Sequence, residues 1–175
     1  MTKELAFYLK AGTVAESLRE GIVYRGARRS EILLLRELYL SLNPGGTFSL
    51  FRAGLSFVTA PKLVVLAYSI EQKKLVGLDF FYFNKRDLEE HTVHEGFIGV
   101  SRDFEGRGIA TQMRLLAKHH FEKAGLSGIS SRISQANAAS LASARKVGFE
   151  PVLLEPARVS DNEEYYLVCG LGSSK

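Results

Sequence analysis

The chain has 175 residues, a net charge of +4 and 46% hydrophobic residues, which predicts one compact domain over residues 1–175 with a substantial core. No apolar run reaches the roughly 20 residues of a membrane span, and the first residues lack the pattern of a signal peptide. The single cysteine, Cys169, allows no internal disulfide and favours a cytoplasmic protein. There is no basic tail or aromatic-basic surface, so no nucleic-acid partner is expected.

The spacing of apolar residues predicts the order of helices and strands. In chain order we expect one or two short helices within 3–19, a strand at 22–25, helices at 30–42 and 47–58, strands at 63–70, 75–83 and 92–100, a helix at 109–124, a strand at 129–133, a helix at 138–147, and strands at 149–154 and 164–169. Ser30 is expected to cap the helix that follows it, and Pro61 to lie beyond the end of the next helix. This order predicts an α/β (α+β) fold, with a mixed, mostly antiparallel central sheet and helices on both faces.

A glycine turn follows the strand that ends at Val100. Gly106 and Gly108 precede a helical pattern that runs from Ile109 to Gly125. The N–H groups at a helix start lack partners and carry the positive end of the helix dipole, so they bind anions. Glycine has no side chain, which lets a phosphate approach the backbone. The turn indicates an anion site, although a turn that only caps the helix explains the same residues.

A second segment, some 30 residues further along the chain, supports the first reading. Asn137 is expected to cap a helix, Gly148 to end it and Phe149 to begin the next strand. The two segments together resemble motifs A and B of the GNAT superfamily, the acyl-CoA-dependent N-acyltransferases. The residues that fit the fixed points of these motifs are Gly106, Gly108 and Ala110 in motif A, and Asn137, Ser140, Gly148 and Phe149 in motif B.

The resemblance covers roughly residues 21–169, with residues 1–20 as an N-terminal extension, and two residues depart from the family pattern. Glu105 stands where the family usually has Arg or Gln, and an acid adds no attraction for phosphate. Arg102 and Arg107 would then have to supply the positive charge. Ala144 stands where many members carry a tyrosine general acid, so that role is vacant or held elsewhere.

The resemblance implies an acetyl-CoA site built on the two motifs. In the GNAT fold the strand before motif A and the strand after its helix splay apart, and the pantetheine arm of CoA enters the gap. A backbone N–H near Gly99 or Val100 is expected to stabilise the oxyanion. Arg102, Arg145 and Lys146 are candidates for the adenosine 3′-phosphate. The cofactor-binding residues that we expect are Ile98, Gly99, Val100, Arg102, Glu105, Gly106, Arg107, Gly108, Ile109, Ala110, Asn137, Ser140 and Arg145.

A general base is needed because an alkyl amine is almost fully protonated at neutral pH. His94, on the strand before motif A, is the first candidate because its ordinary pKa of about 6.5 suits a base. Glu95 is the second, although strand alternation directs it to the opposite face unless a bulge intervenes. Asp79 lies in an apolar run and either binds the acceptor's amine or faces solvent. No metal is expected, since His91 and His94 would point to opposite faces of a strand.

A general acid for the departing thiolate is harder to identify. Tyr165, Tyr166 and Ser143 carry suitable hydroxyls, and of the two adjacent tyrosines at most one can face the site. Water is the alternative, because the CoA thiolate leaves readily. Cys169 could act as a nucleophile, but a buried strand cysteine is the simpler interpretation.

The resemblance therefore implies an N-acyltransferase. We expect direct transfer of acetyl from acetyl-CoA to a primary amine, carried by a small amine, an amino acid, a peptide or an amino sugar. The alternative is a GNAT-fold module that binds acyl-CoA or another protein without turnover, which Glu105 and Ala144 favour. The apolar closing strands would allow a homodimer.

Overall fold

The computed structural model describes residues 7, 10–47, 59–152 and 163–172. Within them, eight strands form one sheet of order β1-β2-β3-β4-β5-β6-β8-β7. The strands are β1 (Ser17–Arg19), β2 (Ile22–Gly26), β3 (Val64–Ser69), β4 (Lys74–Tyr82), β5 (Thr92–Val100), β6 (Gly128–Ser134), β7 (Phe149–Pro151) and β8 (Glu164–Gly170). The helices are α2 (Ile32–Leu42), α4 (Lys85–Glu90), α5 (Ile109–Lys123) and α6 (Ala138–Val147), with short 3-10 turns η1 (Arg29–Glu31) and η2 (Arg102–Phe104).

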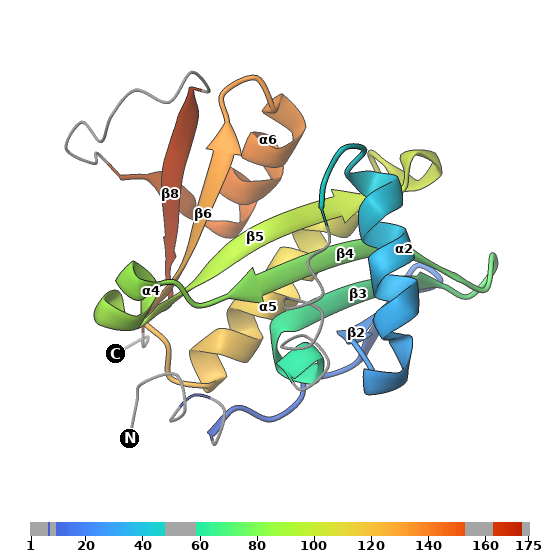
Figure 1. The fold of residues 1–175 in the computed structure, drawn as a ribbon, viewed down its shortest axis with the longest axis horizontal. Coiled ribbons are helices and arrows are strands. Elements are labelled where there is room, and N and C mark those ends of the chain that lie inside the picture. Colours follow the sequence, from blue (N-terminus) through green and yellow to red (C-terminus); the bar gives the residue numbers. More distant parts are fainter. Residues whose placement is uncertain (1–6, 8–9, 48–58, 153–162, 173–175) are drawn as a thin grey trace.

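Helices cover both faces of this sheet (Figure 1). On one face, α5 and α6 bury a large core that includes Met113, Phe121 and Leu141. On the other face, α2 covers a smaller core that includes Leu35 and Leu38. The predicted fold class, a mixed and mostly antiparallel sheet between helices, is confirmed.

The only parallel pair among these strands, β5 and β6, opens along its length. Their ladder runs from Thr92 opposite Gly128 to Glu95 opposite Ser131 and then stops. Beyond that point β5 stays paired with β4, and β6 stays paired with β8. Figure 1 shows the two strands diverging, with α6 packed beside β6. The splay that the resemblance implied is therefore present.

A bulge at Gly96 changes the direction of the side chains that follow it on β5. In the pairing with β4, Phe81 lies opposite Glu95 and Phe80 opposite Phe97, so Gly96 has no counterpart. A Cβ placed at Gly96 would lie 2.5 Å from the ring of Tyr82. Only glycine fits this close approach, and the bulge turns Phe97 to the α2 face.

Most predicted elements are confirmed within one or two residues. The strand predicted at 149–154 ends at Pro151, with residues 153 and 154 outside the described residues, and the N-terminal part was wrong at three points. Residues 17–19 form β1 and not a helix, because Glu20 and Gly21 adopt positive φ (49° and 74°) and turn the chain back into β2. Ser30 lies in η1 and caps nothing. Residues 59–63 are helical through Pro61, whereas the predicted helix was to stop before it; residues 48–58 of that helix lie outside the described residues.

The helix α4 was missed. Its start is a capping box: the Asn84 side chain accepts from the Asp87 N–H (3.0 Å), and the Asp87 carboxylate accepts from the Asn84 N–H (3.4 Å). It ends at Glu90, and its C-cap His91 has φ of 59°. Six residues are too few to show a helical period, so the Asn-x-x-Asp pair was its only sequence signal.

Candidate functional site

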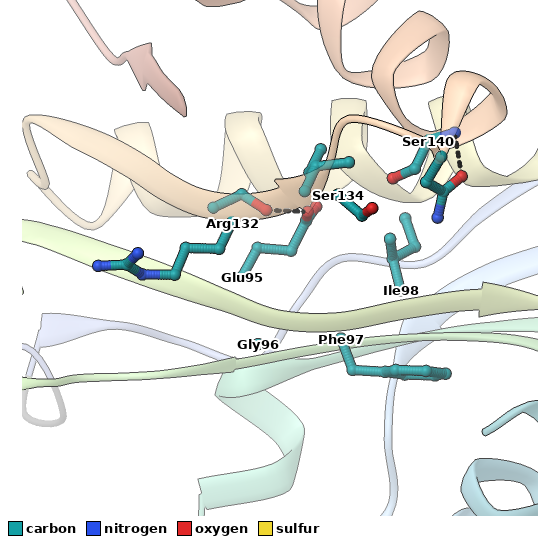
Figure 2. A pocket seen from close by; sticks show the side chains of 10 residues that line it. Glu95, Gly96, Phe97, Ile98, Arg132, Ser134 and Ser140 are labelled. Atoms are coloured by element: carbon teal, nitrogen blue, oxygen red, sulfur yellow. Dashed lines mark hydrogen bonds between the residues drawn. The ribbon is translucent and has the colours of Figure 1, made fainter. Parts of the chain in front are cut away.

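A cavity of about 200 Å³ lies in the gap between β5 and β6. It is lined by Glu95, Gly96, Phe97, Ile98, Ser131, Arg132, Ile133, Ser134, Asn137 and Ser140. Figure 2 shows Glu95 and Ile98 pointing to the side where Ser140 lies, while Phe97 points to the other side of the strand. The cavity is closed where the β5–β6 ladder ends, at Glu95 and Ser131.

The glycine turn lies beyond the end of β5 and leads into α5, whose first N–H groups have no partner inside the helix. Gly106 and Gly108 both have left-handed backbones (φ 73° and 76°), and no atom would contact a Cβ at either position. The first bond of α5 runs from the Gln112 N–H to the Gly108 carbonyl, which leaves three first-turn N–H groups without a partner inside the helix. The turn therefore offers donors, positive dipole and open space to an anion.

The charged side chains of this turn do not enclose the backbone donors. Arg107 donates through Nη2 to the Asp103 carbonyl (3.0 Å), and its guanidinium lies 4.8 Å over the ring of Phe104. Arg102 and Glu105 are exposed. Gly106 and Gly108 are themselves exposed, so the backbone of the turn is open to an anion.

The start of α6 forms the far wall of the cavity. The Asn137 side chain accepts from the Ser140 N–H (3.0 Å), so the predicted N-cap is confirmed. Both residues line the cavity. The cap uses the Asn137 carbonyl oxygen and leaves its amide NH₂ available as a donor.

The structure separates the expected cofactor-binding residues into three groups. Ile98, Asn137 and Ser140 line the cavity. Gly99 and Val100 continue β5 toward the turn that holds Arg102, Glu105, Gly106, Arg107, Gly108, Ile109 and Ala110. Arg145 is exposed on α6 and does not line the cavity.

Glu95 is held by a buried ion pair with Arg114 of α5. Arg114 Nε lies 2.7 Å from Oε1 and Nη2 lies 2.8 Å from Oε2, and Ser131 Oγ donates to Oε2 (2.9 Å). The two side chains are 2% and 1% exposed. Arg114 also donates to the Ser140 carbonyl (3.0 Å), which ties β5, β6, α5 and α6 together. With both carboxylate oxygens engaged, Glu95 is less suited than His94 to accept a proton.

Arg114 and Ser131 were missed by the sequence reasoning. Arg114 carried a readable signal, because it lies three residues before Ala117 and seven before Phe121, on the apolar face of the predicted helix. A charged residue on a buried face requires a buried partner. The sequence does not identify that partner.

The position of Asp79 contradicts both interpretations from the sequence, which were that it binds the acceptor's amine or faces solvent. It is 0% exposed, so it does not face solvent, and it does not line the cavity. Neither carboxyl oxygen has a hydrogen-bond partner. Burial raises its pKa well above the ordinary range, the negative charge of Glu95 adds to the rise, and Arg114 partly offsets it. Asp79 is therefore a core residue whose burial favours the neutral form of its carboxyl.

We expect Asp79→Asn to stabilise the protein at neutral pH. A carboxyl whose pKa is raised by folding contributes most stability below its unfolded pKa of about 3.9, and loses it as pH rises toward the folded value. The amide cannot ionise, so the gain over the wild type should grow between about pH 4 and pH 7. Urea unfolding at several pH values measures it, with the exposed Asp103→Asn as control. If the gain in stability of Asp79→Asn over the wild type is smaller at pH 7 than at pH 4, the prediction is wrong.

His94 lies on the opposite face of β5 from Glu95, as strand alternation predicted, because the bulge follows Glu95 and does not precede it. It is 6% exposed, and its ring packs edge-on against Tyr82 with centroids 5.1 Å apart. Burial lowers the His94 pKa below its ordinary value, and the positive charge of Arg132 lowers it further. The negative charges of Asp87, Glu95 and Glu164 oppose this lowering. His94 is not among the cavity's lining residues, although it adjoins Glu95 at the closed end.

None of the candidate acids lines the cavity. Tyr165 is 37% exposed on β8, and neither it nor Tyr166 lines the cavity. The buried Tyr166 ring contacts the guanidiniums of Arg86 and Arg132 at 4.5 Å and 5.5 Å, and its hydroxyl has no partner. The remaining hydroxyl candidate, Ser143, is bonded to Thr111 (3.2 Å).

Cys169 is a core residue. It is 0% exposed, and burial raises the pKa of its thiol. A buried thiol of raised pKa is a poor nucleophile, in agreement with the simpler interpretation of this residue.

The described residues show neither a metal site nor a membrane span. They contain no group of three or more His, Cys, Asp or Glu side chains that could hold a metal ion. None of their helices is both long and apolar enough to cross a membrane.

Comparisons with known proteins agree with this geometry. Residues 60–150, just over half of the chain, match the family model of the acetyltransferase (GNAT) domain. A segment of 98 residues is 30% identical to mycothiol acetyltransferase of Mycobacteroides abscessus, covering 55% of this chain and 32% of that protein. The match thus spans about a third of the relative's length.

Solved structures share the fold at low identity. A chain of the NatC complex bound to Gag peptide and CoA has a TM-score of 0.74 at 15% identity, covering 86% of this chain and 99% of that one. Ribosomal-protein-S5-alanine acetyltransferase from Vibrio fischeri has a TM-score of 0.73 at 13% identity, covering 92% of this chain and 99% of that one.

Proposed function

The chain belongs to the GNAT acetyltransferase family, and on that premise we propose that it transfers acetyl from acetyl-CoA directly to a primary amine of a small molecule. The observation that carries the proposal is the splay of β5 and β6, with a cavity that is closed at Glu95 and Ser131. The open end of β5 leads to the glycine turn. One strand, β5, would thus hold the thioester arm along its length and lead to a phosphate site in the turn that follows it.

The backbone around the two motifs fits CoA. Gly106 and Gly108 have left-handed backbones with open space, where a pyrophosphate would accept from the first-turn N–H groups of α5. The pantetheine arm would lie along residues 98–100, with the Asn137 NH₂ as a donor. Arg102 and Arg145 are exposed and would contact the 3′-phosphate. When bound, acetyl-CoA supplies an activated acyl group as its thioester.

His94 acts as the general base in this proposal. Burial lowers its pKa, so its imidazole is neutral at pH 7 and can accept a proton. The ring adjoins the closed end of the cavity but does not line it. The acceptor's ammonium proton therefore reaches His94 through one water or by direct approach of the amine from the α2 face.

Water is the proton donor to the leaving thiolate. We expect Tyr165→Phe and Tyr166→Phe each to keep kcat within about threefold of the wild type, since removing an essential acid would cost about 100-fold or more. Tyr166→Phe should also be at least as stable as the wild type, because it removes a buried hydroxyl without a partner. Rates at saturating acetyl-CoA and thermal unfolding measure both effects. A large fall in kcat with unchanged CoA binding would place the acid on β8.

The test of the function is release of free thiol from acetyl-CoA. Separate pools of small amines, amino acids, short peptides and amino sugars are incubated with the protein and acetyl-CoA, and mass spectrometry identifies the acetylated product. Thiol release that depends on one pool supports the proposal and identifies the acceptor class. Tight CoA binding with no acceptor-dependent release from any pool supports a binding module instead.

A further inference from the structure

We propose that Asp87 and Ser130 are positioning residues that hold His94 in the tautomer with its proton on Nδ1. The lone pair of the neutral ring then lies on Nε2, the nitrogen left to accept a proton. The tautomer follows from the hydrogen bonds alone, whereas its effect on rate rests on the proposed role of His94 as base. The three residues come from α4, β6 and β5 respectively.

The contacts form one buried chain. Ser130 Oγ lies 2.7 Å from His94 Nδ1 and donates to Asp87 Oδ1, also at 2.7 Å. Thr92 Oγ1 donates to the same carboxylate oxygen (2.7 Å), and the Asn84 N–H donates to the other (3.4 Å). Asp87 and Ser130 are each 0% exposed, so no solvent replaces these partners.

Counting protons fixes the tautomer. Every contact on the Asp87 carboxylate comes from a donor group, and an ionised carboxylate can only accept. Ser130 has one hydroxyl proton, and it is given to Asp87. Its oxygen must therefore accept from His94, which places the ring proton on Nδ1.

The same chain favours the charged form of the ring once His94 has taken a proton. Burial and the positive charge of Arg132 lower the His94 pKa. The negative charge of Asp87, together with those of Glu95 and Glu164, opposes this lowering. An imidazolium donates from both nitrogens, so the Nδ1–H bond to Ser130 is kept during proton transfer. The ring does not need to turn between the two states.

Long-range ¹H–¹⁵N NMR of the histidine rings tests the tautomer without any assumption about activity. The chain has 4 histidines, and the spectrum of His94→Gln identifies the signals of His94. In the wild type above the His94 pKa we expect a protonated Nδ1 and an unprotonated Nε2. The opposite pattern in the wild type overturns the proposal, and this measurement needs no destabilised variant.

Ser130→Ala tests the positioning role. We expect the NMR preference for Nδ1–H to be lost, and kcat to fall about 10- to 100-fold with an unchanged KM for acetyl-CoA. Thr92→Val is the matched control, because it removes an equal bond to Asp87 Oδ1 and Thr92 makes no hydrogen bond to His94; it should keep the tautomer. If His94 keeps its Nδ1–H tautomer in Ser130→Ala, the role of Ser130 is overturned. The same holds if the tautomer is lost but kcat is unchanged. If His94→Ala itself keeps the full rate, the proposed base has failed and the tautomer assignment stands.

Discussion

Gly108→Glu is expected to weaken CoA binding by about 100-fold or more while leaving the protein folded, which corresponds to a loss of about 2.7 kcal/mol of binding free energy. The side chain would project into the open space beside the first turn of α5, where the pyrophosphate must approach the backbone. It would also place a negative charge against a dianion. Isothermal titration calorimetry with CoA measures the loss, and circular dichroism confirms the fold.

The other end of α5 offers a matched control. Gly125 also has a left-handed backbone (φ 84°, against 76° for Gly108) and also faces open space. Glutamate at either position should cost a similar 1 to 2 kcal/mol or so of stability, because the backbone strain is the same. Gly125→Glu should keep CoA binding. Equal CoA affinity in the two folded variants would remove the glycine turn from the proposed site.

His94→Ala is expected to lower kcat by about 10²- to 10⁴-fold, the range for loss of a general base, with little change in CoA affinity. The base must be neutral to accept a proton, so the rate of the wild type falls as pH drops through the His94 pKa. Burial places that pKa below the ordinary value of about 6.5, so the acidic limb of the rate profile should lie below that pH. The limb should be absent from the variant.

Two further variants make this result specific. His119→Ala replaces an exposed histidine on α5 and should keep both the rate and the acidic limb. Glu95→Gln disturbs the buried pair with Arg114 and should mainly lower stability. If His94→Ala keeps the limb and most of the rate while Glu95→Gln loses both, the base is Glu95.

Local rules allowed the sequence to predict the parts of the site that depend on neighbouring residues. The bounds of α6, its cap at Asn137 and its end at Gly148 were all predicted. Caps and positive-φ turns depend on the chemistry of a few adjacent residues, so one sequence contains the information. The strand 92–100 was also predicted at its observed bounds.

Only the tertiary structure decided what the polar residues of β5 do. His94 meets Ser130, which is 36 residues away, and Glu95 meets Arg114, which is 19 residues away. The bulge at Gly96 turns Phe97 to the α2 face, and the core encloses Asp79. These contacts depend on strand order, register and the packing of α5 against the sheet. Hydrogen bonds between residues this far apart form only after those long-range features exist, so no local pattern in the sequence specifies them.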